Sequence, residues 1–232
     1  MPDLRLDPPR TLPTYAVRAP LARWLRDQAA QAHDALGDYR LLDVGCGEKP
    51  YAPIFAPYVS THVGVDPVEN PHAELRGPVE ALPVEDGSYD VVLCSQVLEH
   101  VDDPAQAVRE LCRALRPGGW LLLTTHGTYY YHPLPNDFWR WTHAGLEKVL
   151  RDNGEWASVN VMPASGTTAC IAMLLNIYID LAARRAHVGA LAKPLVAALN
   201  TAAAGIDGRS ARLGGPGPGS LHANLHAVAV SR

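Results

Sequence analysis

The sequence predicts an α/β fold: a mostly parallel, seven-stranded sheet with helices on both faces, plus a helical insertion before the last strand. Three observations predict it. Between residues 40 and 163, continuous aliphatic strands alternate with helical segments, as in parallel sheets covered on both faces. The 232 residues, 47% of them apolar, suffice for one sizeable core. The last eight residues alternate as a strand that would return to the sheet, which makes the apolar stretch before them an insertion.

Residues 1–39 are predicted to form an N-terminal arm and a helix. Residues 1–19 contain four prolines and are predicted to be extended. Residues 20–36 carry an apolar stripe at helical spacing, which predicts a helix packed on the sheet. The stripe consists of Leu21, Trp24, Leu25 and Ala29. The N-terminus has no apolar signal core, which favours a cytoplasmic protein.

Residues 40–164 are predicted to form the central sheet, with right-handed crossovers between parallel strands. The predicted strands are RLLDVG (40–45), THVGVD (61–66), a short edge strand at 74–79, YDVVLCS (89–95), WLLLTTH (120–126) and WASVNVMP (156–163). The predicted helices are PYAPIFAPYV (50–59), 103–115 and 143–153.

The helix at 103–115 has the strongest local signals. Asp103 is predicted as its N-cap, Pro104 as its first residue and Gln106 as the partner in a capping box. Apolar residues then recur at helical spacing until Pro117-Gly118-Gly119 ends the pattern.

Two apolar helices are predicted within the insertion, residues 165–214, before a linker and final strand at 215–232. The segment TACIAMLLNIYIDLAA (168–183) is interpreted as a buried helix, with a dimer face or a lid over an apolar substrate as alternatives. It is shorter than the roughly 20 residues of a membrane span and contains Asn176 and Asp180, so no transmembrane span is predicted.

Charge and cysteine usage narrow the function. The formal charge of −4 and the absence of a basic run other than Arg184-Arg185 disfavour a nucleic-acid partner. The four cysteines are scattered in apolar surroundings without a CxxC pair, so we expect reduced core thiols and no metal.

A glycine turn follows the first strand in LLDVGCGEKPY (41–51). Such a turn lets backbone N–H groups approach a ligand, but Pro50 stands where a dinucleotide-binding motif has its third glycine. Asp43 interrupts the apolar strand, where a cationic ligand end would compensate its charge. Asp66 ends the next strand, where an acid can accept from ribose hydroxyls. Together the two acids favour an adenosine ligand that carries a positive group.

These motifs resemble class I S-adenosylmethionine-dependent methyltransferases of the small "type 11" sort, which implies a Rossmann-like fold and S-adenosylmethionine as cofactor. The resemblance rests on LLDVGCG, VGVDP, VEALPVEDGSYDVVLCSQVLEHVDDP and ELCRALRPGGWLLLTT, between about residues 40 and 126. The later HPLPNDFWRWTHAGLEKVL resembles one subgroup, and the resemblance fades beyond residue 155.

The resemblance implies a set of cofactor-binding residues. Asp43, Gly45, Cys46 and Gly47 would surround the methionine end, Asp66 would bind the ribose, Pro67 would lie beside the adenine, and Ser95 and Gln96 would face the sulfonium and amino group. Pro78 departs from the pattern, because relatives often have an acid there for the adenine. The backbone N–H of Val79 can still pair with the ring, and Glu80 is either a substitute acid or merely solvated.

The segment HGTYYYHPLPNDFWRWTH (126–143) is the predicted substrate loop, 126–142, because the carboxyl ends of the strands face the site. A base is needed only if the acceptor loses a proton, and His126 is the first candidate, His132 the second and His100 the third. Three aromatic residues are predicted to stack on the acceptor, Tyr129, Tyr131 and Trp139, and three more are further candidates, Tyr130, Phe138 and Trp141. Arg140 could pair with an acceptor carboxylate or phosphate. In the alternative interpretation, Asp137 and Arg140 pin the loop and the aromatic rings fill its underside.

The predicted function is methyl transfer from S-adenosylmethionine to a small molecule, more often at oxygen than at nitrogen or carbon. One alternative is a sugar or lipid-linked acceptor, with residues 165–205 as a lid or membrane-facing surface. Another is a cofactor-binding module without transfer activity. An iron site of His126, His132 and Asp137 is a minor alternative. A homodimer through the helices at 165–208 is the predicted assembly to test.

Overall fold

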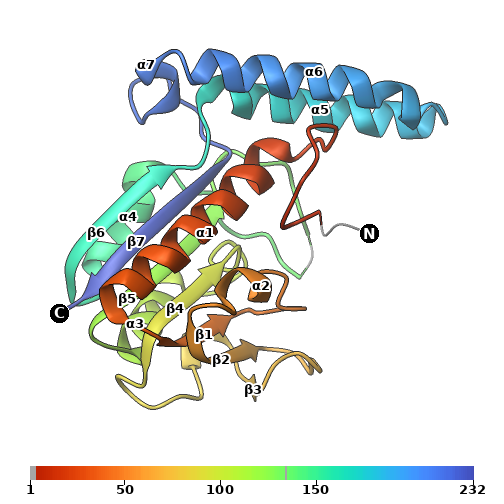
Figure 1. Ribbon diagram of the computed structural model, residues 1–232. Helices are drawn as coiled ribbons and strands as arrows, with labels where there is room; N and C mark the ends of the chain where they lie inside the picture. The colour runs from red at the N-terminus through yellow and green to blue at the C-terminus, as the bar shows by residue number, and fades with distance from the viewer. Residues whose placement is uncertain (1–3, 134) are drawn as a thin grey trace.

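A seven-stranded sheet runs through the computed structural model, which describes residues 4–133 and 135–232 (Figure 1). The strands lie in the order β3-β2-β1-β4-β5-β7-β6. Their bounds are β1 Tyr39–Val44, β2 Val59–Asp66, β3 Leu75–Arg76, β4 Tyr89–Ser95, β5 Leu115–His126, β6 Trp156–Pro163 and β7 Asn224–Ser231. Strands β3, β2, β1, β4 and β5 are parallel, and β7 runs antiparallel to both of its neighbours. The predicted mostly parallel sheet, including the returning last strand, is confirmed.

Helices cover both faces of this sheet (Figure 1). Their bounds are α1 Tyr15–Leu36, α2 Ala52–Phe55, a 3-10 helix at Val79–Ala81, α3 Pro104–Ala114, α4 His143–Asp152, α5 Thr167–Arg185, α6 Gly189–Asp207 and α7 Ala211–Gly214. Neighbouring strand residues face opposite ways: Leu41 packs in the cluster with α1 and α2, and Leu42 packs in the cluster with α3 and α4. The continuous apolar strands seen in the sequence reflect this burial on both sides.

The N-terminal helix begins earlier than predicted. Residues 4–14 form turns rather than an extended arm, α1 starts at Tyr15, and Pro20 lies inside it. Pro20 cannot donate to the helix, which predicts a boundary at that point. Burial decides otherwise, because Ala16 and Val17 pack into a cluster with α5 and α6. Residues 1–3 of the predicted arm lie outside the described residues.

The segment between β1 and β3 is less regular than predicted. The helix expected at 50–59 shortens to α2, and Val59 already belongs to β2. Pro57 accounts for this end, because proline has no N–H to continue the helical hydrogen bonds after Ala56. The edge strand expected at 74–79 contains only Leu75–Arg76 and leads into the 3-10 helix at Val79–Ala81.

The predicted helix at 103–115 is confirmed as α3, with Asp103 accepting a hydrogen bond from the backbone N–H of Gln106. The capping box is only half formed. The Gln106 side chain donates to the carbonyl of Glu80 instead of returning to Asp103. The cap thereby ties α3 to the segment that follows β3. Two further predictions, the helix at 143–153 and the strand at 156–163, agree with α4 and β6.

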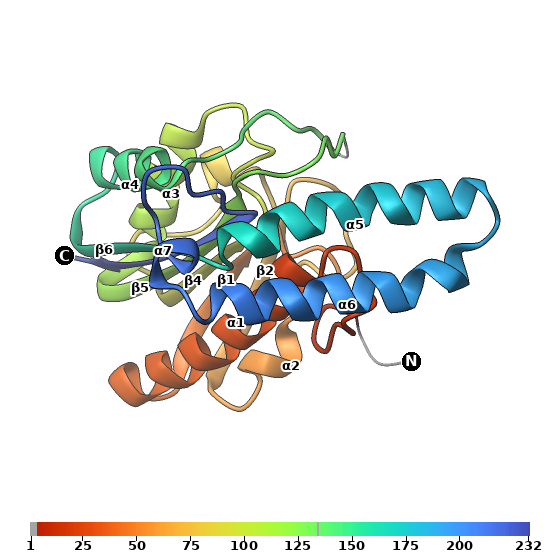
Figure 2. The ribbon, with the colours of Figure 1, turned by 90° about the horizontal axis from the view of Figure 1, so that it is seen from above.

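The insertion between β6 and β7 contains an antiparallel helical hairpin, α5 and α6, that extends beyond the edge of the sheet (Figures 1 and 2). The interpretation of 168–183 as a buried helix is wrong, because Tyr178 is 67% exposed and most of α5 is accessible. With 19 residues each, both helices are long and apolar enough to cross a membrane by length and composition. The argument from segment length against a span therefore does not hold.

Candidate functional site

The glycine turn after β1 requires glycine at two positions. Gly45 and Gly47 have φ values of +66° and +51°, in the left-handed region that glycine adopts readily. A Cβ atom at Gly45 would overlap Val97 Cγ2. The backbone N–H groups of Gly45 and Cys46 both donate to the Val65 carbonyl, at 2.8 and 3.1 Å, which holds the turn over the end of β2. The turn therefore presents bare backbone to whatever lies above it.

A cavity of about 380 Å³ opens at the carboxyl ends of β1, β4 and β5, where ligands bind in open α/β sheets. Nine residues predicted from the sequence line it: Gly45, Cys46, Gly47, Ser95, Gln96, His100, His126, Tyr129 and His132. The structure thus brings together the turn, the end of β4 and part of the substrate loop. Arg18, Glu48, Tyr51 and Glu99 also line the cavity and were not predicted.

A second cavity, of about 220 Å³, lies on the other side of Gly45. Pro67, Val79 and Glu80 line it together with Pro78 and Val97. Its lining is mostly apolar, which suits the faces of an aromatic base. Glu80 Oε1 accepts a hydrogen bond from the Asp102 backbone N–H at 3.0 Å, so this carboxylate already has a partner in the chain.

Asp66 lies at the end of β2 and is 8% exposed; it lines neither cavity itself, whereas the next residue, Pro67, lines the smaller one. Asp66 Oδ2 accepts from the Gly47 N–H at 3.1 Å and from Asn70 Nδ2 at 3.2 Å, and its Oδ1 accepts from the Val68 N–H at 3.2 Å. An ionised carboxylate offers about four lone-pair positions, so a hydroxyl could still bind or could replace Asn70. Asn70 was missed; its signal is an Asx turn, in which its Oδ1 accepts from the His72 N–H.

Asp43 lies beneath the turn in β1 and is 5% exposed. Its Oδ2 is 3.2 Å from Nε2 of His62, which stands on the adjacent β2. Burial raises the pKa of the Asp43 carboxyl, and the hydrogen bond from His62 opposes that rise. The sequence argument assigned the compensation of this charge to a ligand. His62 supplies part of this compensation within the chain: the parallel register pairs His62 with Leu41, two residues before Asp43, so both side chains lie on the same face of the sheet.

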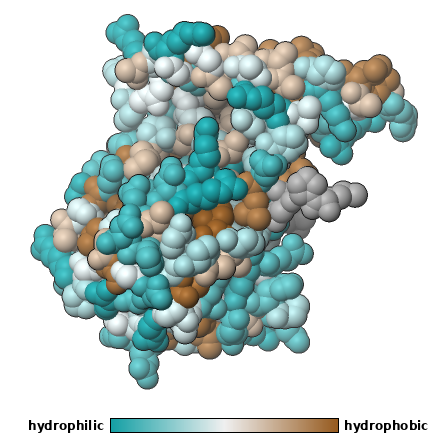
Figure 3. All heavy atoms as spheres, viewed as in Figure 1, coloured by the Kyte–Doolittle hydropathy of each residue, from teal (hydrophilic) through white to brown (hydrophobic). Residues whose placement is uncertain are grey.

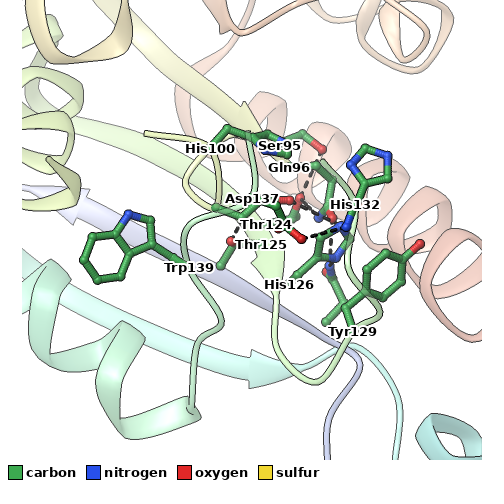
Figure 4. Close-up of polar contacts among 12 residues, drawn as sticks. Ser95, Gln96, His100, Thr124, Thr125, His126, Tyr129, His132, Asp137 and Trp139 are labelled. Atoms are coloured by element: carbon green, nitrogen blue, oxygen red, sulfur yellow. Dashed lines mark hydrogen bonds and ion pairs between the residues drawn. The ribbon is translucent and has the colours of Figure 1, made fainter. Parts of the chain in front are cut away.

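The ends of β4, β5 and β7 are joined by a polar network (Figure 4). Ser95 Oγ and Gln96 Nε2 both reach Thr124 Oγ1, at 3.0 and 2.9 Å, and Asn224 Nδ2 donates to Gln96 Oε1 at 3.0 Å. Gln96 holds a φ of +59°, which is uncommon for a residue with a side chain and costs energy. Asn224 was missed because it follows Gln96 by 128 residues and only the returning last strand brings it here.

His126 and Glu99 form a buried pair in the cavity wall. Nε2 of His126 is 3.4 Å from Oε1 of Glu99, and Asn224 Nδ2 is 3.3 Å from His126 Nδ1. The imidazole also stacks on Tyr129, with ring centroids 3.8 Å apart. Burial, with Arg140 adding to it, lowers the pKa of His126 to about 3, and burial raises the pKa of Glu99 to about 7. With both ring nitrogens facing protein groups, His126 is poorly placed to take a proton from a substrate.

His100 and His132 line the cavity with their rings 6.0 Å apart. His100 Nδ1 lies 2.5 Å from the Asn136 carbonyl, which fixes that nitrogen as a donor and leaves Nε2 as an acceptor. His132 Nδ1 is buried without a hydrogen-bond partner among residues 4–133 and 135–232. Buried polar atoms are rarely unpaired, so this nitrogen marks a position for a ligand or water.

Arg140 pins the substrate loop rather than facing the cavity. Its guanidinium donates to both oxygens of Asp137 and to the carbonyls of Tyr129 and Tyr130, the last at 2.9 Å. Asp137 also accepts from the His132 N–H at 2.7 Å. The alternative interpretation of this pair therefore matches the structure. Arg140 has no donor left for an acceptor carboxylate or phosphate.

The predicted stacking residues separate into two groups. Tyr129 lines the cavity, whereas Tyr131 is 74% exposed. Trp139 points away from the histidine cluster in Figure 4, and its Nε1 donates to the Val101 carbonyl at 2.8 Å. Within the described ranges no three His, Cys, Asp or Glu side chains converge as metal ligands do, which leaves the iron alternative without a site.

Comparison with known proteins identifies the family. The sequence profile of the family described as "Methyltransferase domain" matches residues 14–159, which is more than half of the chain. The chain belongs to this methyltransferase family. The predicted class and its predicted methyl donor, S-adenosylmethionine, are confirmed.

Individual relatives cover part of this methyltransferase. A protein of Bordetella bronchiseptica named ubiquinone biosynthesis O-methyltransferase is 34% identical over 128 residues, which is 49% of this chain and 52% of the relative. The chain thus spans about half the length of these curated relatives. Two solved structures share the fold. The (4+2)-cyclase SpnF superposes with a TM-score of 0.56 at 21% identity, over 90% of this chain and 81% of SpnF. The 1,6-didemethyltoxoflavin-N1-methyltransferase of Burkholderia thailandensis superposes with a TM-score of 0.52 at 16% identity, over 90% of this chain and 78% of the other.

Proposed function

We propose that this protein transfers the methyl group of S-adenosylmethionine to an oxygen atom of a small molecule. The observation that carries the proposal is the 380 Å³ cavity, because the glycine turn, Ser95 and Gln96 line it together with His100 and His132. A donor and an acceptor can therefore meet in one cavity. The O-methyltransferase name of the Bordetella relative supports oxygen as the acceptor atom.

The cofactor would lie across the glycine turn. Its methionine end fits the larger cavity beside Gly45, Cys46 and Gly47, and its adenine fits the smaller cavity beside Pro67 and Val79. Asp66 would accept from the ribose hydroxyls, with Asn70 as its partner. The bare backbone at Gly45 suits this close approach, because any side chain there would strike Val97.

When bound, the cofactor supplies a methyl group already activated as a sulfonium, so the chain's own residues mainly orient the acceptor and exclude water. Removal of a hydroxyl proton would fall to His100 through Nε2 or to His132 through Nδ1, because both residues line the cavity and neither atom has a hydrogen-bond partner among the described residues. We assign His126, the first candidate from the sequence, to the wall that positions Tyr129.

Arg18 takes the anion-binding role that the sequence suggested for Arg140. It projects from α1 into the lining of the cavity and is partly buried. Among the described residues no carboxylate forms an ion pair with it, whereas Arg140 is held by Asp137. We therefore propose an acceptor that carries a carboxylate, phosphate or phenolate near its reacting hydroxyl.

The rival proposal is a cofactor-binding protein that performs no methyl transfer. It is favoured by one observation: SpnF, with the same fold, is described as a cyclase, so the fold alone does not decide the reaction. The cytoplasmic location predicted from the sequence remains part of our proposal.

Two measurements on the full chain test these ideas. Calorimetry should detect binding of S-adenosylmethionine and its demethylated product. Mass spectrometry should then detect methylated product from a panel of hydroxylated aromatic acids. Binding of both ligands without any methylated product in the panel would favour the rival. Failure to bind either ligand would remove both proposals.

The acceptor assignments need a separate test. His132→Ala should lower the turnover rate more than the cofactor affinity, and Arg18→Ala should raise KM for an anionic acceptor more than for its neutral analogue. Arg140→Ala should instead lower stability, because it releases the loop. Equal kinetic effects of Arg18→Ala on both acceptors would contradict the proposed role.

A further inference from the structure

The α5–α6 hairpin carries most of the exposed apolar surface of the molecule. Of the fourteen large apolar side chains that are exposed among the described residues, eight lie between 167 and 207: Ile171, Leu175, Tyr178, Leu181, Val188, Leu191, Leu195 and Ile206. Figure 3 shows tan and brown side chains along the upper edge of the hairpin and at its free end. Single exposed apolar residues are ordinary, but a contiguous set of this size usually marks an interaction surface.

The two faces of each helix have different tasks. On α5, Met173, Asn176 and Ile177 point inward and are buried. Ile171, Leu175 and Tyr178 recur at spacings of four and three residues, which places them together on the other face. A helix that is apolar on every side usually has a partner on every side. The chain itself covers only the inner face, so the outer face of α5 and α6 lacks a partner within the described residues.

The charge of the hairpin is opposite in sign to that of the rest of the chain. The hairpin, residues 167–207, contains three Lys or Arg and two acids, Asp180 and Asp207, whereas the whole chain has 20 Lys or Arg against 24 acids. Asp180 is engaged by Arg184 at 2.6 Å. Arg185, the last residue of α5, and Lys193, near the start of α6, lie toward the free end of the hairpin without an ion pair among the described residues. Apolar side chains beside unpaired cations are the composition of segments that lie on anionic membranes.

The root of the hairpin is fastened to the fold. Asn200 Nδ2 donates to the carbonyls of Arg10 and Leu12, at 2.7 and 3.0 Å. Asp207 accepts from the first N–H groups of α5, those of Thr168 and Ala169, at 3.0 and 2.9 Å. Crossing a bilayer would break these contacts and expose Asn200 to hydrocarbon. Resting the outer face on a surface keeps all of them.

We propose that the outer face of the α5–α6 hairpin lies on an anionic lipid surface. The other occupant to consider is a second copy of this chain, but two hairpins would bring like charges together, whereas phosphate-bearing headgroups complement Arg185 and Lys193. Helix α5 would then lie between the lipid and the cavity, since Val17 packs with the buried inner face of α5 and also lines the cavity. The proposal concerns a surface outside the cofactor site and does not depend on methyl transfer.

Vesicle flotation of the full chain tests the proposal. The protein should float with vesicles of phosphatidylcholine and phosphatidylglycerol, and less with phosphatidylcholine alone or at high salt. Leu191→Glu with Leu195→Glu should lower the partition coefficient at least about tenfold, because each buried leucine contributes on the order of tenfold or more. Arg185→Glu with Lys193→Glu should lower it on anionic vesicles only. Val68→Glu, at an apolar residue 62% exposed elsewhere, is the matched control and should bind like the wild type.

Sedimentation velocity and circular dichroism complete the experiment. The hairpin variants should keep the wild-type melting temperature, since the changed side chains are exposed, and a variant with altered melting is replaced by Tyr178→Gln. A wild type that ignores anionic vesicles but forms a dimer, which Leu191→Glu dissociates, would overturn the proposal in favour of the second copy. Equal loss of vesicle binding in the Val68→Glu control would also overturn it.

Discussion

Helices α3 and α5 show how two apolar helices of one chain can be used differently. Leu111 on α3 is fully buried, and the opposite face of α3 carries charged residues such as Arg109 and Arg113. α5 has apolar residues on both faces, yet only its inner face is buried. The polar face of α3 shows that only its apolar face needs to be buried, and the sheet buries that face. α5 lacks a polar face, so its sequence did not show whether one face or both faces would be covered by other segments. In the folded chain only the inner face is covered.

The largest expected effect tests whether the two helices contribute differently to stability. Leu111→Ala should lower the free energy of unfolding by about 2–5 kcal/mol, because it leaves a cavity in a packed core. Leu191→Ala, at a residue 77% exposed, should change it by less than about 0.5 kcal/mol. Chemical denaturation measures both. A similar loss in the two variants would mean that the hairpin is covered in solution.

The next effect concerns pH, which should act through the cavity region and not through the hairpin. Burial raises the pKa of Glu99 from 4.5 to about 7, so the folded state keeps a proton that the unfolded chain releases. The contribution of this group to the free energy of unfolding therefore falls between about pH 4.5 and pH 7. Glu99→Gln removes the fall, so the variant should gain about 2–3 kcal/mol over the wild type between pH 4.5 and pH 8.

His126 acts in the opposite direction, which is why the comparison uses the difference between variant and wild type. Burial lowers the pKa of His126 from 6.5 to about 3, so its contribution to stability rises with pH across that interval in both proteins. The matched hairpin variant is Asn176→Ala, which breaks the neutral pair with Asn200. Its loss of stability should be the same at every pH. A pH-independent difference for Glu99→Gln would contradict the prediction.

The third prediction compares the cavity region and the hairpin by their effect on the affinity for S-adenosylmethionine. Asp66→Ala should weaken binding of S-adenosylmethionine by about 1.5–3 kcal/mol in calorimetry, the scale of charge-assisted hydrogen bonds. Glu69→Ala, an exposed acid of the same loop, and Leu191→Glu on the hairpin should leave the affinity unchanged. Weaker cofactor binding in Leu191→Glu would show that the hairpin belongs to the cofactor site.

The smallest effect compares how the two helices begin. Asp103→Ala removes a cap made by an adjacent residue and should cost about 1 kcal/mol of unfolding free energy. Asp207→Ala removes a cap of α5 supplied from the far end of α6, at a similar cost of about 1–2 kcal/mol. In addition, Asp207→Ala should make the hairpin more sensitive to limited proteolysis. Equal proteolysis of both variants would argue against a hairpin that depends on this contact.

Local signals predicted those parts of the molecule whose partners lie nearby in the chain. Asp103 and Pro104 mark the start of α3, and the alternation in 156–163 matches β6 residue for residue. The glycine turn after β1 was also predictable from local sequence, since Gly45 and Gly47 take the left-handed conformations that glycine allows. The start of α1 was not predictable in this way, because burial of Ala16 against the insertion outweighs the boundary signal of Pro20.

The sequence predicted which types of residue stand in the candidate site, but not which other residues each of them contacts. His126 and Arg140 were sound choices of chemistry for a methyltransferase pocket. Their availability depended on Glu99 and Asp137, which occupy them in the folded chain. Asn224 and Arg18 reach the same region from the last strand and the first helix. Nothing in the spacing of either residue could have indicated this.

The sequence by itself determined the alternation of strands and helices, the glycine turn and the acid that ends β2, because each depends on neighbouring residues and on backbone conformation. The tertiary structure decided which polar groups remain available and which apolar surfaces remain uncovered. Both depend on which distant segments meet, since a side chain's partner sets its charge, its exposure and its role. In this chain, the pairing of β7 with β5 and the packing of α1 against α5 and α6 determined which polar groups stay available and which apolar surfaces stay uncovered.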